Sequence, residues 1–128
     1  MLGDFPMSAR LAASDIQRAR AWYEASLGLT PEREEMGGAA LWYRTDATWF
    51  LLYQTESAGT ARNTVGGWEV TGIEAVMAEL RERGVTFEDY DFGEMKTVDG
   101  VLTGPDGSKA AWFNDSEGNT LELTEVRR

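Results

Sequence analysis

The chain has 128 residues, with 12 basic and 22 acidic side chains and a net charge of −10, and this length is typical of one domain. It contains neither cysteine nor histidine, which excludes disulfides, a cysteine nucleophile, a Ser-His-Asp triad and any metal site built on thiolate or imidazole. The acidic surface disfavours nucleic acid as a partner. It either steers cationic molecules toward the protein or only keeps the protein soluble. No apolar run reaches membrane-spanning length and the first residues lack the features of a signal peptide, so we expect no membrane partner and a cytoplasmic location.

The first half of the chain predicts a strand, a helix and three further strands. The segment Ser14-Asp15-Ile16-Gln17 has the S-x-x-Q spacing of a capping box, in which the serine hydroxyl accepts a hydrogen bond from the third backbone N–H of a helix. The helix is predicted to end at Leu27-Gly28, because glycine suits the left-handed residue after a helix. The predicted strands are residues 7–13, 32–36, 39–45 and 48–54.

The second half repeats this order. Thr71-Gly72-Ile73-Glu74 is a second capping box, 57 residues after the first (71 − 14), and it opens a helix predicted to end at Arg83-Gly84. The predicted strands here are 65–70, 86–90, 108–114 and 119–125, with an insert at 91–107. We therefore predict one α+β domain over residues 1–128, made of two βαβββ modules in tandem. Module 1 spans residues 7–54, module 2 spans 64–126, and residues 55–63 link them; curved mixed sheets with outer helices would enclose a cleft.

The repeated unit resembles the vicinal oxygen chelate superfamily, which includes glyoxalase I, extradiol dioxygenases and bleomycin-resistance proteins. The stretch from Ser14 through Ala21-Trp22-Tyr23 to Leu27-Gly28-Leu29 resembles the superfamily pattern D-hydrophobic-x-x-A-x-x-F-Y-x-x-x-L-G-hydrophobic. The stretch WFNDSEGNTLEL, residues 112–123, resembles F-x-D-P-x-G-N-x-x-E-L. The resemblance covers roughly residues 7–126. It implies a homodimer, and it leaves open whether modules pair within one chain or across two.

The resemblance also implies where a metal would bind. Superfamily metalloenzymes take their ligands from four strands facing the cleft, and Ser8, Leu51, Val65 and Glu122 stand at those positions here. Valine and leucine have no lone pair to give, and one carboxylate does not hold a catalytic divalent ion. We therefore predict no metal, no cofactor and no catalytic residue of the metalloenzyme type.

Strand alternation then selects the side chains that share a face with these four positions. It places Trp49 and Tyr53 beside Leu51, and it sends Phe50 and Leu52 to the core. Trp112 is expected to face the cleft, whereas the orientation of Trp42 is left open. The candidate ligand-binding residues are Ser8, Arg10, Trp49, Leu51, Tyr53, Val65, Glu69, Trp112 and Glu122.

Two functions follow from these residues. The favoured one is a metal-free protein that sequesters a planar or cationic small molecule in an aromatic cleft, as the resemblance to antibiotic-binding members implies. The alternative is a lyase, isomerase or dioxygenase-like enzyme that uses Glu122 for acid–base chemistry or with other carboxylates. A dimeric scaffold with a filled cleft is a third possibility.

Overall fold

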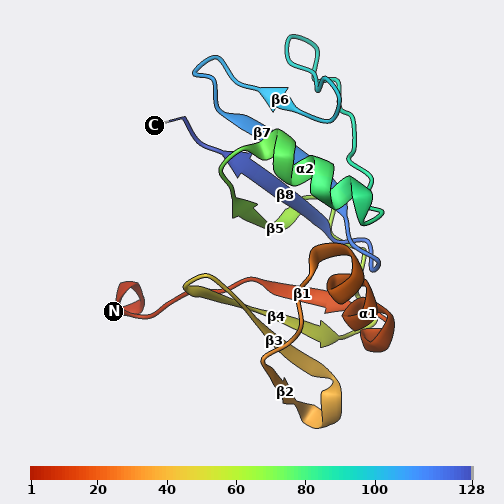
Figure 1. The fold of residues 1–128 in the computed structure, drawn as a ribbon. Helices are drawn as coiled ribbons and strands as arrows, with labels where there is room; N and C mark the ends of the chain where they lie inside the picture. The colour runs from red at the N-terminus through yellow and green to blue at the C-terminus, as the bar shows by residue number, and fades with distance from the viewer. Residues whose placement is uncertain (128) are drawn as a thin grey trace.

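The computed structural model describes residues 1–127 and has the two-module α+β architecture that the repeat predicts (Figure 1). A short 3-10 turn, η1 (Leu2–Asp4), precedes module 1. Module 1 contains β1 (Arg10–Ala13), α1 (Ile16–Leu27), β2 (Arg33–Glu35), a second 3-10 turn η2 (Met36–Gly38), β3 (Ala40–Thr45) and β4 (Thr48–Gln54). Module 2 contains β5 (Thr64–Glu69), α2 (Ile73–Glu82), β6 (Leu102–Thr103), β7 (Lys109–Asn114) and β8 (Thr120–Glu125).

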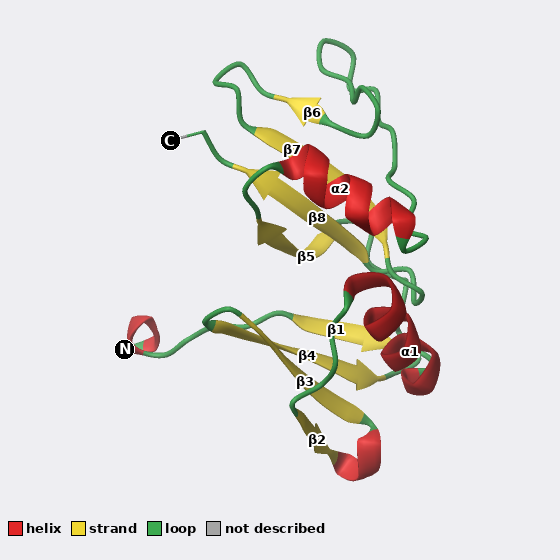
Figure 2. Cartoon of the chain, viewed as in Figure 1, coloured by secondary structure: helices red, strands yellow, loops and turns green. Residues whose placement is uncertain are grey.

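Each module forms its own four-stranded mixed sheet (Figure 2). Sheet A has the strand order β1-β4-β3-β2 and sheet B has the order β5-β8-β7-β6. In both sheets the first strand runs parallel to the last strand of its module, and the other neighbours are antiparallel. The internal repeat seen in the sequence is thus a repeat of strand topology.

The outer strand of sheet B differs from the prediction. Residues 86–90 do not form a strand and contribute one isolated bridge, between Phe87 and Phe113. The outer strand is instead β6, from within the predicted insert. The cause is local: Asp89 accepts hydrogen bonds from Thr97 Oγ1 at 2.7 Å and from the Gly100 N–H at 3.0 Å. These bonds turn the chain away from β7.

The helix caps also differ from the predicted capping boxes. The N-cap of α1 is Asp15, whose side chain accepts a hydrogen bond from the Arg18 N–H. The N-cap of α2 is Gly72, and its side-chain partner comes from β8: the Glu125 carboxylate accepts from the N–H groups of Gly72 at 3.0 Å and Ile73 at 3.1 Å. A cap supplied by a distant strand cannot be found from local spacing. Gly28 ends α1 in the left-handed conformation, as predicted.

The core lies between the two sheets and their helices, and it is one continuous cluster. Burial alternates along the strands, so each sheet has a buried face and an open face. Phe50 and Leu52 are buried, as predicted, while Trp49 and Tyr53 remain 38% and 36% exposed. Trp22 joins the modules by stacking on Phe113, with ring centres 6.4 Å apart.

The modules also meet where β1 lies against β5 (Figure 1). A Cβ atom added at Gly66 would lie 3.7 Å from Leu11 Cδ2 and 3.9 Å from Ala9 Cβ, which is ordinary van der Waals contact. Among residues 1–127, no helix is long and apolar enough to cross a membrane.

Candidate functional site

A row of four residues, one from each strand, crosses the open face of sheet A. The strand register pairs Arg10 with Leu51, Leu51 with Trp42, and Trp42 with Arg33. Directly paired residues project from the same face of a sheet. The register therefore places the Trp42 indole on the open face, which settles the orientation left open by the sequence.

Two guanidinium groups approach the Trp42 ring. Arg10 Cζ lies 5.0 Å from the ring centre and Arg33 Cζ lies 5.5 Å from it. Neighbouring strands are about 4.8 Å apart, so Arg10 must extend across β4 and over the row position of Leu51 to reach Trp42. The indole Nε1 donates a 2.6 Å hydrogen bond to Glu35 Oε1, which fixes the plane of the ring. Cation–π contacts of this kind hold both the ring and the guanidinium groups in place.

A cavity of about 630 Å³ opens beside this row. It lies within the ~300–1,000 Å³ range of small-molecule sites. It is lined by Pro6, Met7, Ser8, Arg10, Arg33, Trp42, Ala47, Thr48 and Trp49. Three of the predicted ligand-binding residues, Ser8, Arg10 and Trp49, are thus brought together here. Arg33 and Trp42 belong to the same cavity and were not among the predicted residues.

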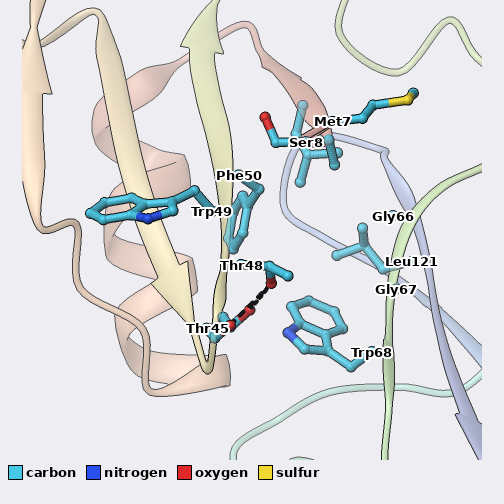
Figure 3. Close-up of a pocket in the computed structure, with 12 residues that line it drawn as sticks. Met7, Ser8, Thr45, Thr48, Trp49, Phe50, Gly66, Gly67, Trp68 and Leu121 are labelled. Carbon is cyan, nitrogen blue, oxygen red and sulfur yellow. Dashed lines mark hydrogen bonds between the residues drawn. The ribbon is translucent and has the colours of Figure 1, made fainter. Parts of the chain in front are cut away.

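A smaller cavity, of about 180 Å³, lies between the modules (Figure 3). Trp68 from β5 lies across it from Thr48, whose hydroxyl donates to the Thr45 carbonyl at 3.0 Å. The Trp49 indole extends away from Phe50 to the other side of β4 (Figure 3). Trp49 and Ser8 border both cavities, but the smaller one is too small for a drug-sized ligand.

Sheet B carries the corresponding row with different chemistry. Gly67 pairs with Glu122, and Glu122 pairs with Trp112. The Trp112 ring meets Tyr90 edge-on at 5.5 Å between ring centres. Both modules therefore pair a tryptophan with the metal-ligand position of their last strand. This position is Leu51 in sheet A and Glu122 in sheet B. Arg10, one of two cations in the row of sheet A, corresponds to Gly67 in sheet B, and Leu51 corresponds to Glu122.

The nine predicted residues do not share one site. Leu51, Tyr53, Val65, Trp112 and Glu122 lie outside both the 630 Å³ and the 180 Å³ cavity. Glu69 lines a separate apolar hollow with Trp68 and Leu123. Within residues 1–127, Glu122 makes no side-chain hydrogen bond or ion pair, so it does not pair with Arg10 or Ser8.

The donor set does not fit the divalent metal of superfamily metalloenzymes. Nowhere in the described residues do three His, Cys, Asp or Glu side chains gather closely enough to hold a metal ion. Leu51 offers no lone pair, and the Arg10 side chain that crosses its row is cationic. A positive guanidinium at this point repels a metal cation.

The motif at residues 112–123 has a structural role between the modules. The buried Asp115 accepts a 2.6 Å hydrogen bond from the Tyr23 hydroxyl on α1 and bonds from the backbone N–H groups of Glu117 and Asn119. Burial raises the pKa of Tyr23 well above its ordinary value, and the Asp115 charge adds to this. The motif therefore holds α1 against the turn between β7 and β8.

Glu117 adds a second contact between α1 and the turn between β7 and β8. Its carboxylate accepts from Arg18 Nε at 2.8 Å and from the Asp15 N–H at 3.0 Å. Burial by itself raises the pKa of Glu117, but the hydrogen bonds from Arg18, Asp15 and Ser116 outweigh burial and lower the pKa to about 2. The carboxylate is ionised at neutral pH and forms a partly buried ion pair with Arg18.

A family model of the Glyoxalase/Bleomycin resistance protein/Dioxygenase superfamily matches residues 7–123. The chain therefore belongs to this superfamily, in agreement with its paired βαβββ modules. Comparison with curated protein sequences gives no match.

Solved structures share the fold over nearly the whole chain. A glyoxalase family protein from Enterococcus faecalis is 22% identical, with a TM-score of 0.72, over 98% of this chain and 100% of that one. A glyoxalase/bleomycin resistance protein from Catenulispora acidiphila is 20% identical, with a TM-score of 0.71, over 96% and 99%. Lactoylglutathione lyase from Agrobacterium tumefaciens is 16% identical, with a TM-score of 0.70, over 94% and 92%. At these identities the likeness establishes the fold, while function depends on the site.

Proposed function

We propose that the protein binds a planar small molecule on the open face of sheet A without a metal, as a binding protein and not as an enzyme. The observation that carries this proposal is the 630 Å³ cavity with two tryptophans in its wall. Trp42 is already oriented by Arg10, Arg33 and Glu35. A ring held in one plane before the ligand arrives loses little entropy when a flat molecule packs against it.

A cytoplasmic homodimer remains part of this proposal. In such a dimer a second copy would cover the open faces of the sheets around the cavity, and the partly exposed Tyr53, which lies outside the cavity, would become buried. Sedimentation of the purified protein tests this directly. A dimer would sediment at twice the chain mass of 14.2 kDa.

The alternative, an enzyme that uses Glu122, has one observation in its favour. Glu122 is half-buried, pairs with Trp112 across the sheet, and makes no side-chain hydrogen bond or ion pair within residues 1–127. A carboxylate without such a partner is available for proton transfer. It has no second carboxylate or histidine beside it in its row, which makes the binding function the better supported one.

The test is calorimetric titration with a panel of planar aromatic compounds on one-, two- and three-ring frames, after removal of metals with EDTA. We expect at least one frame to bind with a Kd in the micromolar range or tighter, and added Zn²⁺, Ni²⁺, Mn²⁺ or Mg²⁺ to leave that Kd unchanged. Trp42→Ala should weaken binding about 10-fold, since an aromatic pair contributes about 0.5–1.5 kcal/mol beyond the area that it buries. Trp112→Ala, at the matching position of sheet B, is the control.

Binding that depends on an added metal, or on Trp112 and not on Trp42, would contradict the proposal. No binding by any frame would contradict it as well.

A further inference from the structure

We propose that the ligand of the sheet A cavity is an anion, an aromatic carboxylate or sulfonate, and that Arg10 receives its charged group. This inference rests on the proposed function, because it names the class of molecule that would stack on Trp42. It reverses the expectation of a cationic ligand that the net charge of −10 suggests.

The first support is the charge of the cavity wall. The chain has almost two acidic residues for each basic one. Within residues 1–127 the wall of this cavity nevertheless contains two arginines, Arg10 and Arg33, and no carboxylate, while Glu35, outside the wall, is bonded to Trp42 and lies 3.9 Å from Arg33. A concave site lined by one sign of charge concentrates the opposite sign in its ligands. The local charge of the cavity therefore favours an anion even though the surface as a whole is acidic.

The second support is that Arg10 is free to bind. Arg33 Nε lies 3.9 Å from Glu35, and Arg44 Nε lies 3.8 Å from Glu32, so both neighbours already face a carboxylate. Arg10 forms no ion pair and no side-chain hydrogen bond with any of residues 1–127, and its described contact is with the Trp42 ring. Its guanidinium group presents a fork of N–H donors that matches a carboxylate or sulfonate.

The third support is the geometry of charge and ring together. The Arg10 guanidinium lies over the Trp42 ring at 5.0 Å. An anion bound to the outer N–H groups of Arg10 would lie at the edge of the indole. An aromatic ring attached to that anion would then pack against Trp49 and the edge of Trp42, because guanidinium groups already lie over the Trp42 ring. Ser8, whose hydroxyl makes no hydrogen bond to residues 1–127, supplies a further donor in the same wall.

The test uses matched triplets of ligands, in which one aromatic frame carries a carboxylate, a carboxamide or an aminomethyl group. The wild-type protein should bind the carboxylate about 10-fold or more tightly than the carboxamide, and the aminomethyl compound most weakly. Arg10→Gln should remove about 10-fold or more of the affinity for the carboxylate while changing the affinity for the carboxamide less than twofold. Arg10→Lys, which keeps the charge but not the fork, should fall between them.

Arg83→Gln is the control, because it removes the same charge at the end of α2 in the other module. It should leave all affinities unchanged. Carboxamide or amine binding as tight as carboxylate binding in the wild type would overturn the anion assignment and leave the planar-ligand proposal standing. Absence of binding by every member of every triplet would overturn both. Equal loss of all three ligands in Arg10→Gln would show that Arg10 only holds Trp42.

A second copy of the chain is the other possible source of a carboxylate for Arg10. If Arg10→Gln converts a dimer to a monomer in sedimentation and leaves carboxylate affinity unchanged, Arg10 binds the partner chain. That result would overturn the proposal.

Discussion

The Tyr23 hydroxyl on α1 donates a 2.6 Å hydrogen bond to Asp115 at the turn between β7 and β8, and this bond connects the two modules through their shared core. Asp115 is buried, and its other oxygen, Oδ1, accepts from two backbone N–H groups. Loss of the tyrosine hydroxyl would remove a hydrogen bond to a buried charged group and leave Oδ2 with one bond, from Asn119 Nδ2 at 2.8 Å. Tyr23→Phe should lower the free energy of unfolding by about 2–3 kcal/mol, measured by urea titration.

Tyr43 is the matched control for Tyr23. Both rings are fully buried, but the Tyr43 hydroxyl has no hydrogen-bond partner among residues 1–127. Removing an unsatisfied buried hydroxyl costs no hydrogen bond, so Tyr43→Phe should be neutral or stabilising. Equal destabilisation by the two substitutions would show that the Tyr23–Asp115 bond contributes nothing beyond ring packing.

The same two tyrosines predict how stability falls in alkali. Burial raises the pKa of Tyr43 to about 12, and it also raises the pKa of Tyr23 well above the ordinary value. The folded state therefore holds these protons more tightly than the unfolded state, whose tyrosines titrate near 10. Their contribution is fully present below pH ~10 and is lost as the pH rises from there through 12. Urea titrations in this range should show the fall, and Tyr43→Phe should reduce it.

Stability in acid depends on Glu117, whose pKa is lowered by folding, whereas the pKa values of the two tyrosines are raised. Its folded pKa of about 2 lies below the unfolded value of about 4.3. The ion pair with Arg18 therefore stabilises the fold above pH ~4.3 and is lost as the pH falls toward 2. One pKa unit corresponds to about 1.4 kcal/mol, so Glu117→Gln should remove roughly 2–3 kcal/mol of stability at pH 7 and much less at pH 2. A loss that stays constant between pH 7 and pH 2 would contradict the lowered pKa.

Two adjacent glycines in β5 should respond differently to alanine. A Cβ at Gly67 would lie 2.6 Å from the Glu122 carbonyl oxygen, closer than a real contact allows. At Gly66 the nearest atom would be Leu121 Cδ2 at 3.6 Å. Gly67→Ala should lower the free energy of unfolding by about 1–3 kcal/mol because β8 must shift. Gly66→Ala should be neutral within about 0.5 kcal/mol, and a reversed order would show that β5 and β8 are spaced differently.

Glu122 should contribute little to ligand binding on sheet A. It lies in the row of sheet B and borders neither cavity beside Trp49. Glu122→Gln keeps the shape of the side chain and removes its charge, so calorimetry should show a Kd within twofold of wild type. A loss of affinity of 10-fold or more would show that the two open faces form one site. It would support the alternative function, an enzyme that uses Glu122.

Much of the fold could be predicted from the sequence because it depends on local patterns. Alternation sorted Phe50 and Leu52 from Trp49 and Tyr53, and the glycine at position 28 marked the end of α1. The outer strand of sheet B was missed because hydrogen bonds to the Asp89 side chain redirect the chain there. Hydrogen bonds from a loop to a side chain leave no periodic signal in the sequence.

The candidate site was predicted only in part, for two physical reasons. The orientation of Trp42 was left open although a signal for it was present. The two-residue turn Asp46-Ala47 pairs Thr45 with Thr48, and counting back along both strands pairs Trp42 with Leu51. The reach of Arg10 across β4 to Trp42 has no such signal. Strand alternation gives the face of a side chain but not the direction in which a long side chain lies on it.

The measurement that tests the central claim most directly is the movement of the tryptophan indole N–H signals in ¹H–¹⁵N spectra as a planar aromatic carboxylate is added. The five tryptophans are assigned by single substitution to phenylalanine. Trp42 and Trp49 lie on the open face of sheet A, and Trp112 lies on the open face of sheet B. Trp22 reports on the contact between the modules. We predict that the Trp42 and Trp49 signals move with the ligand while those of Trp22 and Trp112 stay in place. Movement of Trp112 with Trp42 and Trp49 unchanged would place the ligand beside Glu122 and contradict the account.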